Sequence, residues 1–208
     1  MTNFQQSVSN TNWILIAGAL HIAFAAVHAL GKTIDGSGLD TCAIESGAYT
    51  SAALRGIFGG KAYKRGLEYH ITTSLAIMLL QFDAILSTIP KGPVRIQCIA
   101  LKDKLHERNP ETVETFEEIQ SWYAANIKPL EDDKGIGEFA QFLSQYLGQV
   151  ESLLQLISCC HSGDWEGYLS SLENIIKYFF ARDLLNYARL MPVHLSQMNA
   201  LEEDDPET

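Results

Sequence analysis

The residues best placed to do chemistry in this sequence lie in one short C-terminal stretch: Arg182, Asp183, Asn186 and Arg189. If residues 164–191 form one continuous helix, Asp183 and Asn186 fall inside its apolar face and the two arginines line the edge. A carboxylate or amide buried without a partner costs about 1–3 kcal/mol, so these groups must be paired or must bind something. We interpret the four residues as a buried polar cluster that fixes the register of the helix. A catalytic or ligand site lined by Asp183 is the alternative.

A second group of charged residues follows the glycine pair at 59–60 and consists of Lys61, Lys64 and Arg65, beside Tyr63. Such a basic contact patch could meet an acidic partner or a phosphate. Solvated surface at the start of a helix is the simpler interpretation.

Two further patterns suggest chemistry but lack an essential part. The triplet at 31–33, Gly-Lys-Thr, resembles the end of a phosphate-binding loop, but Ala26 stands where that loop needs a glycine. His21 and His28 are about 10.5 Å apart along a helix, too far to share one metal ion, and we expect both to lie in the core. The sequence therefore predicts no catalytic residue, no metal site and no cofactor.

Composition and charge limit the possible function classes. The chain has 208 residues, of which 47% are hydrophobic, and a formal net charge of −10. This composition fits a globular protein with a sizeable core. The negative charge argues against direct nucleic-acid binding, which requires clustered Lys and Arg. Four cysteines (Cys42, Cys98, Cys159 and Cys160) form no C-x-x-C pair, so we expect free thiols in an intracellular compartment.

Hydrophobic periodicity predicts a mainly α fold, an antiparallel helical domain of about five to seven helices with room for one short strand near Trp13. Turn residues at 31–38 predict a loop, and glycines at 59–60 predict a second break. The expected helices cover 20–30, 67–89, 109–128, 139–157 and 164–191, with the last ending at Pro192 and joined to its predecessor by a turn at 161–164.

The same pattern gives the expected domain organisation. Residues 1–12 are polar and are predicted to be flexible, and residues 13–200 are predicted to form a single helical domain. Residues 201–208 read as an acidic, disordered tail.

The run Trp13–Leu30 raises the question of a membrane. It has 18 residues without a formal charge, the lower limit for a spanning helix. Two histidines, many small residues and the absence of Lys or Arg before Lys32 favour a buried core element. A membrane or signal segment is the alternative.

Several sequence blocks resemble the uncharacterised, mobile-element-type open reading frames found in many copies in invertebrate and fish genomes. The blocks are 18–22, 36–39, 45–49, 59–65 and, most specific, 163–189. Such frames are similar to transposase-derived proteins, in which a helical insertion interrupts a ribonuclease-H-like core. Gly18 replaces the cysteine of the C-x-x-H element of hAT-type transposases that would end at His21, and no Asp precedes residues 13–17. The resemblance therefore implies the helical insertion region rather than the nuclease core.

Together these observations predict a non-catalytic helical interaction or assembly module whose partner is another protein or a second copy. One alternative is the remnant of a metal-dependent, nucleic-acid-processing enzyme that uses Asp183. The other is a membrane-associated protein anchored by residues 13–30.

Overall fold

The computed structural model describes residues 18–88 and 137–204, together with isolated residues between them (91–93, 95, 96, 99, 100, 103 and 125). Within these residues the secondary structure is helical, without a strand, which confirms the predicted mainly α class. Seven helices have defined bounds: α2 (Ala19–Ile34), α3 (Leu39–Glu45), α4 (Ser51–Phe58), α5 (Tyr63–Thr88), α9 (Glu138–Ser162), α10 (Trp165–Ala181) and α11 (Leu185–Asp204). The predicted flexible segment 1–12, the optional strand near Trp13 and the acidic helix at 109–128 lie outside the described residues. The limits of the 13–200 domain stay a prediction.

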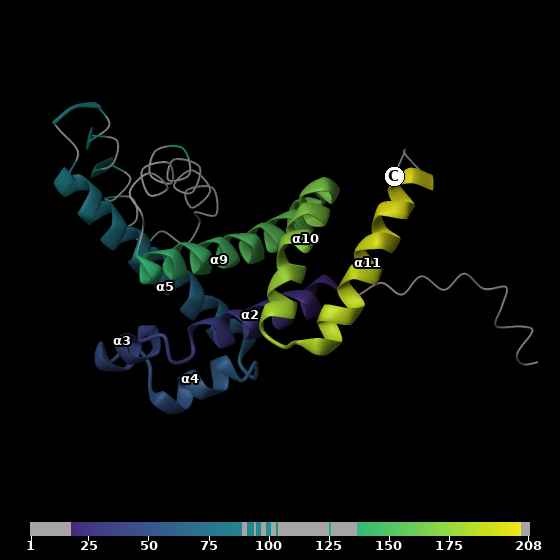
Figure 1. Ribbon diagram of the computed structural model, residues 1–208, viewed down its shortest axis with the longest axis horizontal. Coiled ribbons are helices and arrows are strands. Elements are labelled where there is room, and N and C mark those ends of the chain that lie inside the picture. Colours follow the sequence, from purple (N-terminus) through teal and green to yellow (C-terminus); the bar gives the residue numbers. More distant parts are fainter. Residues whose placement is uncertain are drawn as a thin grey trace, which may run out of the picture.

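Helix α2 lies at the centre of the fold and contacts α4, α5, α9 and α10 (Figure 1). Its large side chains at Ile22, Leu30 and Ile34 are fully or almost fully buried, and alanines fill the turns between them. Small residues on several sides let four helices pack around one. Most of the run from Ile22 to Leu30 is therefore core, whereas Leu20, His21 and Phe24 are exposed.

The predicted loop at 31–38 is wrong over its first four residues, because α2 continues through Ile34. Gly31 is buried there, and a Cβ atom at this position would lie 2.8 Å from the Cα of Phe58 in α4. Gly66 plays the same part in α5, where a Cβ would lie 2.7 Å from Cγ1 of Val27. Both glycines serve close helix packing rather than a turn.

Helices α9 and α10 form the predicted helical hairpin. The Asp164 carboxylate accepts a hydrogen bond from the Gly167 backbone N–H at 3.0 Å and so caps the start of α10. Leu153 of α9 and Phe179 of α10 are fully buried beside α2. The α5 helix is also confirmed, although it begins at Tyr63, four residues before the predicted 67.

The prediction of one continuous helix over 164–191 is wrong. Helix α10 ends at Ala181 and α11 begins at Leu185, with Asp183 in the left-handed region at φ 53°. The Leu184 N–H donates to the Phe179 carbonyl at 3.0 Å and the Asp183 N–H to the Phe180 carbonyl at 3.4 Å. This is the Schellman helix ending, whose left-handed position glycine usually occupies. Because an aspartate and not a glycine occupies this position, the sequence pattern does not indicate the helix end.

The predicted end at Pro192 is also wrong, since α11 continues through this proline to Asp204. A proline inside a helix removes one backbone hydrogen bond. The packing of α11 against α10 outweighs that loss. The first four residues of the predicted tail, 201–204, consequently belong to α11.

Candidate functional site

The predicted polar cluster lies on the surface, not inside a helix interface. Asp183, Asn186 and Arg189 are exposed and Arg182 is half-buried. The turn at 182–184 ends the helical register on which the buried arrangement depended. The interpretation as a buried polar cluster is therefore wrong, and the position of Asp183 follows from the backbone geometry of the turn.

A lysine of α2 binds the turn between α10 and α11. Lys32 Nζ donates to the Arg182 backbone carbonyl at 2.9 Å, across 150 residues of sequence. Arg182 is the C-cap of α10, where unpaired carbonyls carry partial negative charge that a cation stabilises. The lysine of the Gly-Lys-Thr triplet thus caps a helix end. Its neighbour Thr33 is buried, with its hydroxyl oxygen 2.9 Å from Oε1 of Gln149 in α9.

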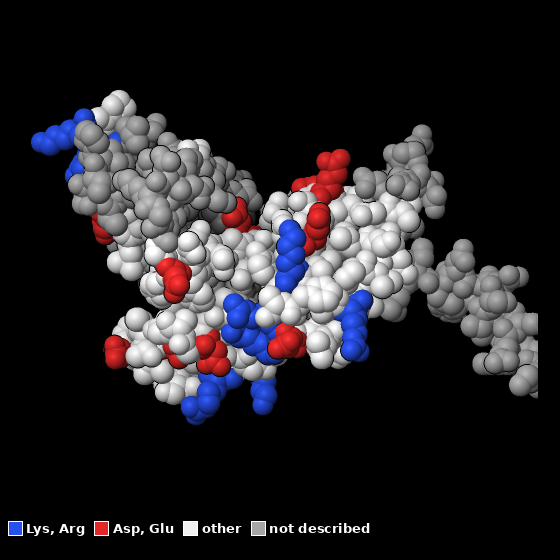
Figure 2. All heavy atoms as spheres, in the orientation of Figure 1, with Lys and Arg blue, Asp and Glu red and all other residues white. Residues whose placement is uncertain are grey.

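The predicted basic contact patch is exposed, as expected for a surface at a helix start. Lys61, Lys64 and Arg65 all lie open to solvent at and just before the first turn of α5. Tyr63 packs its ring on Phe24 of α2 with centroids 4.2 Å apart, and burial raises its pKa. Figure 2 shows acidic and basic side chains interspersed along the edge that carries α3, α4 and the α10–α11 turn.

The two N-terminal histidines occupy different environments. His21 is exposed, so its expected place in the core is wrong, whereas His28 is half-buried against Gly60. Burial, and secondarily the charge of Lys32, lowers the pKa of His28 below its ordinary value. The two histidines do not lie side by side.

Two buried tyrosine–histidine pairs were not predicted from the sequence. His70 Nδ1 of α5 lies 2.9 Å from the Tyr146 hydroxyl of α9, and the Tyr168 hydroxyl of α10 lies 2.9 Å from His194 Nε2 of α11. Both histidines are almost completely buried. Burial lowers the pKa of His70 to about 3 and raises the pKa of Tyr146, so both are neutral near pH 7. Each residue sits in an apolar stripe of its own helix, but the sequence does not reveal the partner.

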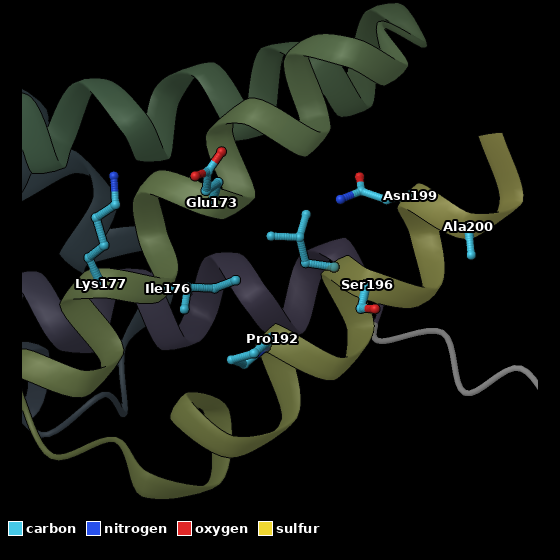
Figure 3. Close-up of a pocket in the computed structure, with 8 residues that line it drawn as sticks. Glu173, Ile176, Lys177, Pro192, Ser196, Asn199 and Ala200 are labelled. Carbon is cyan, nitrogen blue, oxygen red and sulfur yellow. The ribbon is translucent and has the colours of Figure 1, made fainter. Parts of the chain in front are cut away.

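An open groove separates α10 from the second half of α11 (Figure 3). Its volume is about 580 Å³, and Ile176, Pro192 and Leu195 provide its apolar lining. The remaining lining residues are polar or small: Glu173, Lys177, Ser196, Asn199 and Ala200. Sequence reasoning missed the groove because it ended the last helix at Pro192.

Large apolar side chains are also exposed at the end of α10 and on the first half of α11. Phe180 is 59% exposed, Leu185 57% and Val193 56%, while Leu190 is 37% exposed. All four lie within fourteen residues of sequence at the end of α10 and the first half of α11. Clusters of this kind often mark protein contact sites. The C-terminal pair of helices is the candidate functional surface.

Metal-binding clusters and membrane-spanning helices are both absent from the described residues. No group of three or more His, Cys, Asp or Glu side chains there is arranged to hold a metal ion. No described helix combines the length and the apolar character needed to cross a bilayer.

Comparison with known proteins gives one match. Searches of curated proteins and of solved structures returned none. The model of one family, described only as a domain of unknown function, covers residues 1–208. The chain therefore belongs to the DUF8702 family.

Proposed function

We propose that this chain is a non-catalytic helical interaction module that assembles with another protein or with itself through its α10–α11 surface. The observation that carries the proposal is the group of exposed apolar side chains at Phe180, Leu185 and Val193. Leaving such side chains in water forgoes the stabilisation that burial would give, and a partner that covers them recovers it.

The rest of the molecule supports this location. The neighbouring core is closed by fully buried side chains such as Phe179 and Met191, so the exposed apolar residues are not part of an incomplete core. Lys32 and the Tyr168–His194 pair hold both helices in place. A surface held rigidly before binding loses less entropy when a partner docks.

The test compares the full chain with the double variant Leu185→Ser and Val193→Ser. We expect an unchanged melting temperature, because both side chains are more than half exposed. We also expect the variant to lose a protein contact, with itself or with another chain, that crosslinking and mass spectrometry detect for the wild type.

The matched control is Leu20→Ser, because Leu20 is 59% exposed but lies at the start of α2. The control keeps the wild-type contacts. A double variant with the same contacts as the wild type would overturn the proposed function.

We further propose that the module derives from the helical insertion of a mobile-element protein and acts inside the cell. The sequence blocks at 18–22 and 163–189 support this origin, and Cys42, Cys159 and Cys160 are free thiols in the structure. The genomic sequence around the frame tests the origin. Coding segments for a ribonuclease-H-like core on both sides of the frame would support this origin. Unrelated genes on both sides, at several genomic copies of the frame, would contradict it.

A further inference from the structure

The charged residues of α11 are arranged against the helix dipole: its arginine lies near the N-terminal end and its acidic residues lie at the C-terminal end. Arg182 and Asp183, of opposite charge, precede the helix and Arg189 lies exposed in its second turn, whereas Glu202, Glu203 and Asp204 close its C-terminal end. A helix favours acidic residues at its N-terminal end and basic residues at its C-terminal end. No acidic residue lies in the first turn of α11 and no basic residue in the last.

The two preceding helices follow the rule that α11 breaks. Helix α9 has Glu138 in its first turn and His161 in its last. Helix α10 has Asp164 and Glu166 at its start, and Lys32 binds its final carbonyl. The acidic C-terminal end of α11 is thus an exception among these three helices, and a partner of complementary charge would offset it.

The groove beside α11 has its polar residues distributed in the same direction. Glu173 of α10 lies at the end of the groove near Asn199, toward the acidic end of α11 (Figure 3). Lys177 follows one turn later on α10, toward the end where α11 begins. The apolar lining of Ile176, Pro192 and Leu195 lies between the two ends. The surface therefore has an acidic end, a basic end and an apolar middle.

Such a surface is complementary to itself when two copies meet in opposite directions. Arg189 and Glu203 are separated by about four helical turns, or roughly 21 Å, which places the two positions on one side of α11. Ser196 lies midway between them, with Pro192 and Ala200 at equal distances before and after it. A twofold axis at Ser196 would bring each Arg189 to the Glu203 of the other copy, as a closed symmetric interface requires.

We propose that two copies of this chain form a symmetric dimer in which the two α11 helices pair antiparallel along the α10–α11 grooves. The pairing sets the basic end of each copy against the acidic end of the other and offsets the reversed helix charges. It covers the apolar groove lining and the exposed Val193. This inference rests on the proposed function and names a second copy as the partner.

The experiment uses two charge-reversed forms of the full chain. The acidic form carries Lys177→Glu and Arg189→Glu, and the basic form carries Glu173→Lys and Glu203→Lys. Sedimentation equilibrium measures the association of each form alone and of their equimolar mixture. A control form, Lys64→Glu with Arg65→Glu, makes the same charge change as the acidic form but on α5.

We expect the wild type and the control to dimerise. Like charges then meet at both ends in either reversed form alone, so each association constant falls roughly tenfold or more. The mixture restores dimers, because one form is acidic at both ends and the other is basic at both ends. Thermal denaturation of each form checks that the fold is retained.

Two results would overturn the dimer. A wild type that stays monomeric excludes self-association but leaves the proposed function open to another protein partner. Reversed forms that dimerise like the wild type place the interface elsewhere on the chain. Loss of the contacts in the crosslinking test, by contrast, concerns the α10–α11 surface whatever its partner is.

Discussion

Two tyrosine–histidine pairs of the same length hold different parts of this molecule together, and their surroundings differ. His70 and Tyr146 join α5 to α9 beside the central α2, and both are fully buried. Tyr168 and His194 join α10 to α11, beside exposed apolar side chains and the groove. The first pair belongs to a closed core, and the second orients a helix whose other side is open. The same local chemistry thus lies in a closed core in one region and, under the proposed function, orients a contact surface in the other.

The largest contrast between the two regions is expected from side-chain truncation. Leu153→Ala removes a fully buried side chain beside α2 and should cost about 2–5 kcal/mol of unfolding free energy, through lost burial and the cavity left behind. Val193→Ala on α11 should change the same quantity by no more than about 0.5 kcal/mol. Urea denaturation of both variants measures the difference. Similar losses would show that Val193 is packed as tightly as a core residue and does not lie on an open side of α11.

The unfolding free energy should fall at acid pH, and the pH range of the fall should identify His70 as the titrating group. Burial lowers the pKa of His70 from 6.5 to about 3, so below pH 6.5 the unfolded chain binds a proton that the folded chain excludes. Stability should therefore fall as the pH drops from 6.5 towards 3, by about 1.4 kcal/mol per pH unit from this group, and the group contributes no pH dependence above 6.5. The measurement is urea denaturation across this range.

Two variants separate burial from hydrogen bonding as the cause. His70→Phe removes the titrating group and should flatten its contribution to the pH profile. Tyr146→Phe keeps His70 buried and should retain the slope while lowering stability at every pH. An unchanged slope in His70→Phe would assign the acid sensitivity to other groups.

Removing either tyrosine hydroxyl should lower the unfolding free energy by a similar amount, but the part of the structure that loosens should differ. Tyr146→Phe and Tyr168→Phe each remove one hydrogen bond and leave a buried ring nitrogen without that partner, at about 1–3 kcal/mol. Hydrogen exchange should show loosening throughout α2, α5 and α9 for Tyr146→Phe. For Tyr168→Phe it should show loosening mainly in α11. Uniform loosening in both variants would remove the distinction between the regions.

A smaller stability effect than that of the tyrosine variants is expected at the turn between α10 and α11. Asp183 has φ 53°, so Asp183→Ala should cost about 1 kcal/mol for placing Ala in the left-handed region, while Asp183→Gly should be neutral or stabilising. Thermal denaturation distinguishes the two. A loss in Asp183→Gly as large as in Asp183→Ala would show that the carboxylate, not the backbone, matters there.

The sequence indicates the helices better than their ends or their partners. The apolar spacing of α5 and of α9 is a local signal, and both helices are confirmed. The break at Asp183 and the passage of α11 through Pro192 are not visible locally, because tertiary packing overrides residue preference at both places.

The candidate surface was less predictable for the same reason. The four residues of the predicted polar cluster depended on one helical register, and a single turn moved them to the surface. Lys32 and Arg182 meet across 150 residues, which spacing alone does not show. The order of charges in α11, from Arg189 to Glu203, can be read from the sequence. It can be compared with the helix dipole only once the helix bounds are known.

The measurement that tests the central claim most directly is sedimentation equilibrium of the wild-type chain beside the Leu185→Ser, Val193→Ser variant. We predict a reversible monomer–dimer equilibrium for the wild type and a monomer for the variant, with equal melting temperatures extrapolated to low concentration. A variant that dimerises as strongly as the wild type would contradict the assignment of α10 and α11 as the assembly surface.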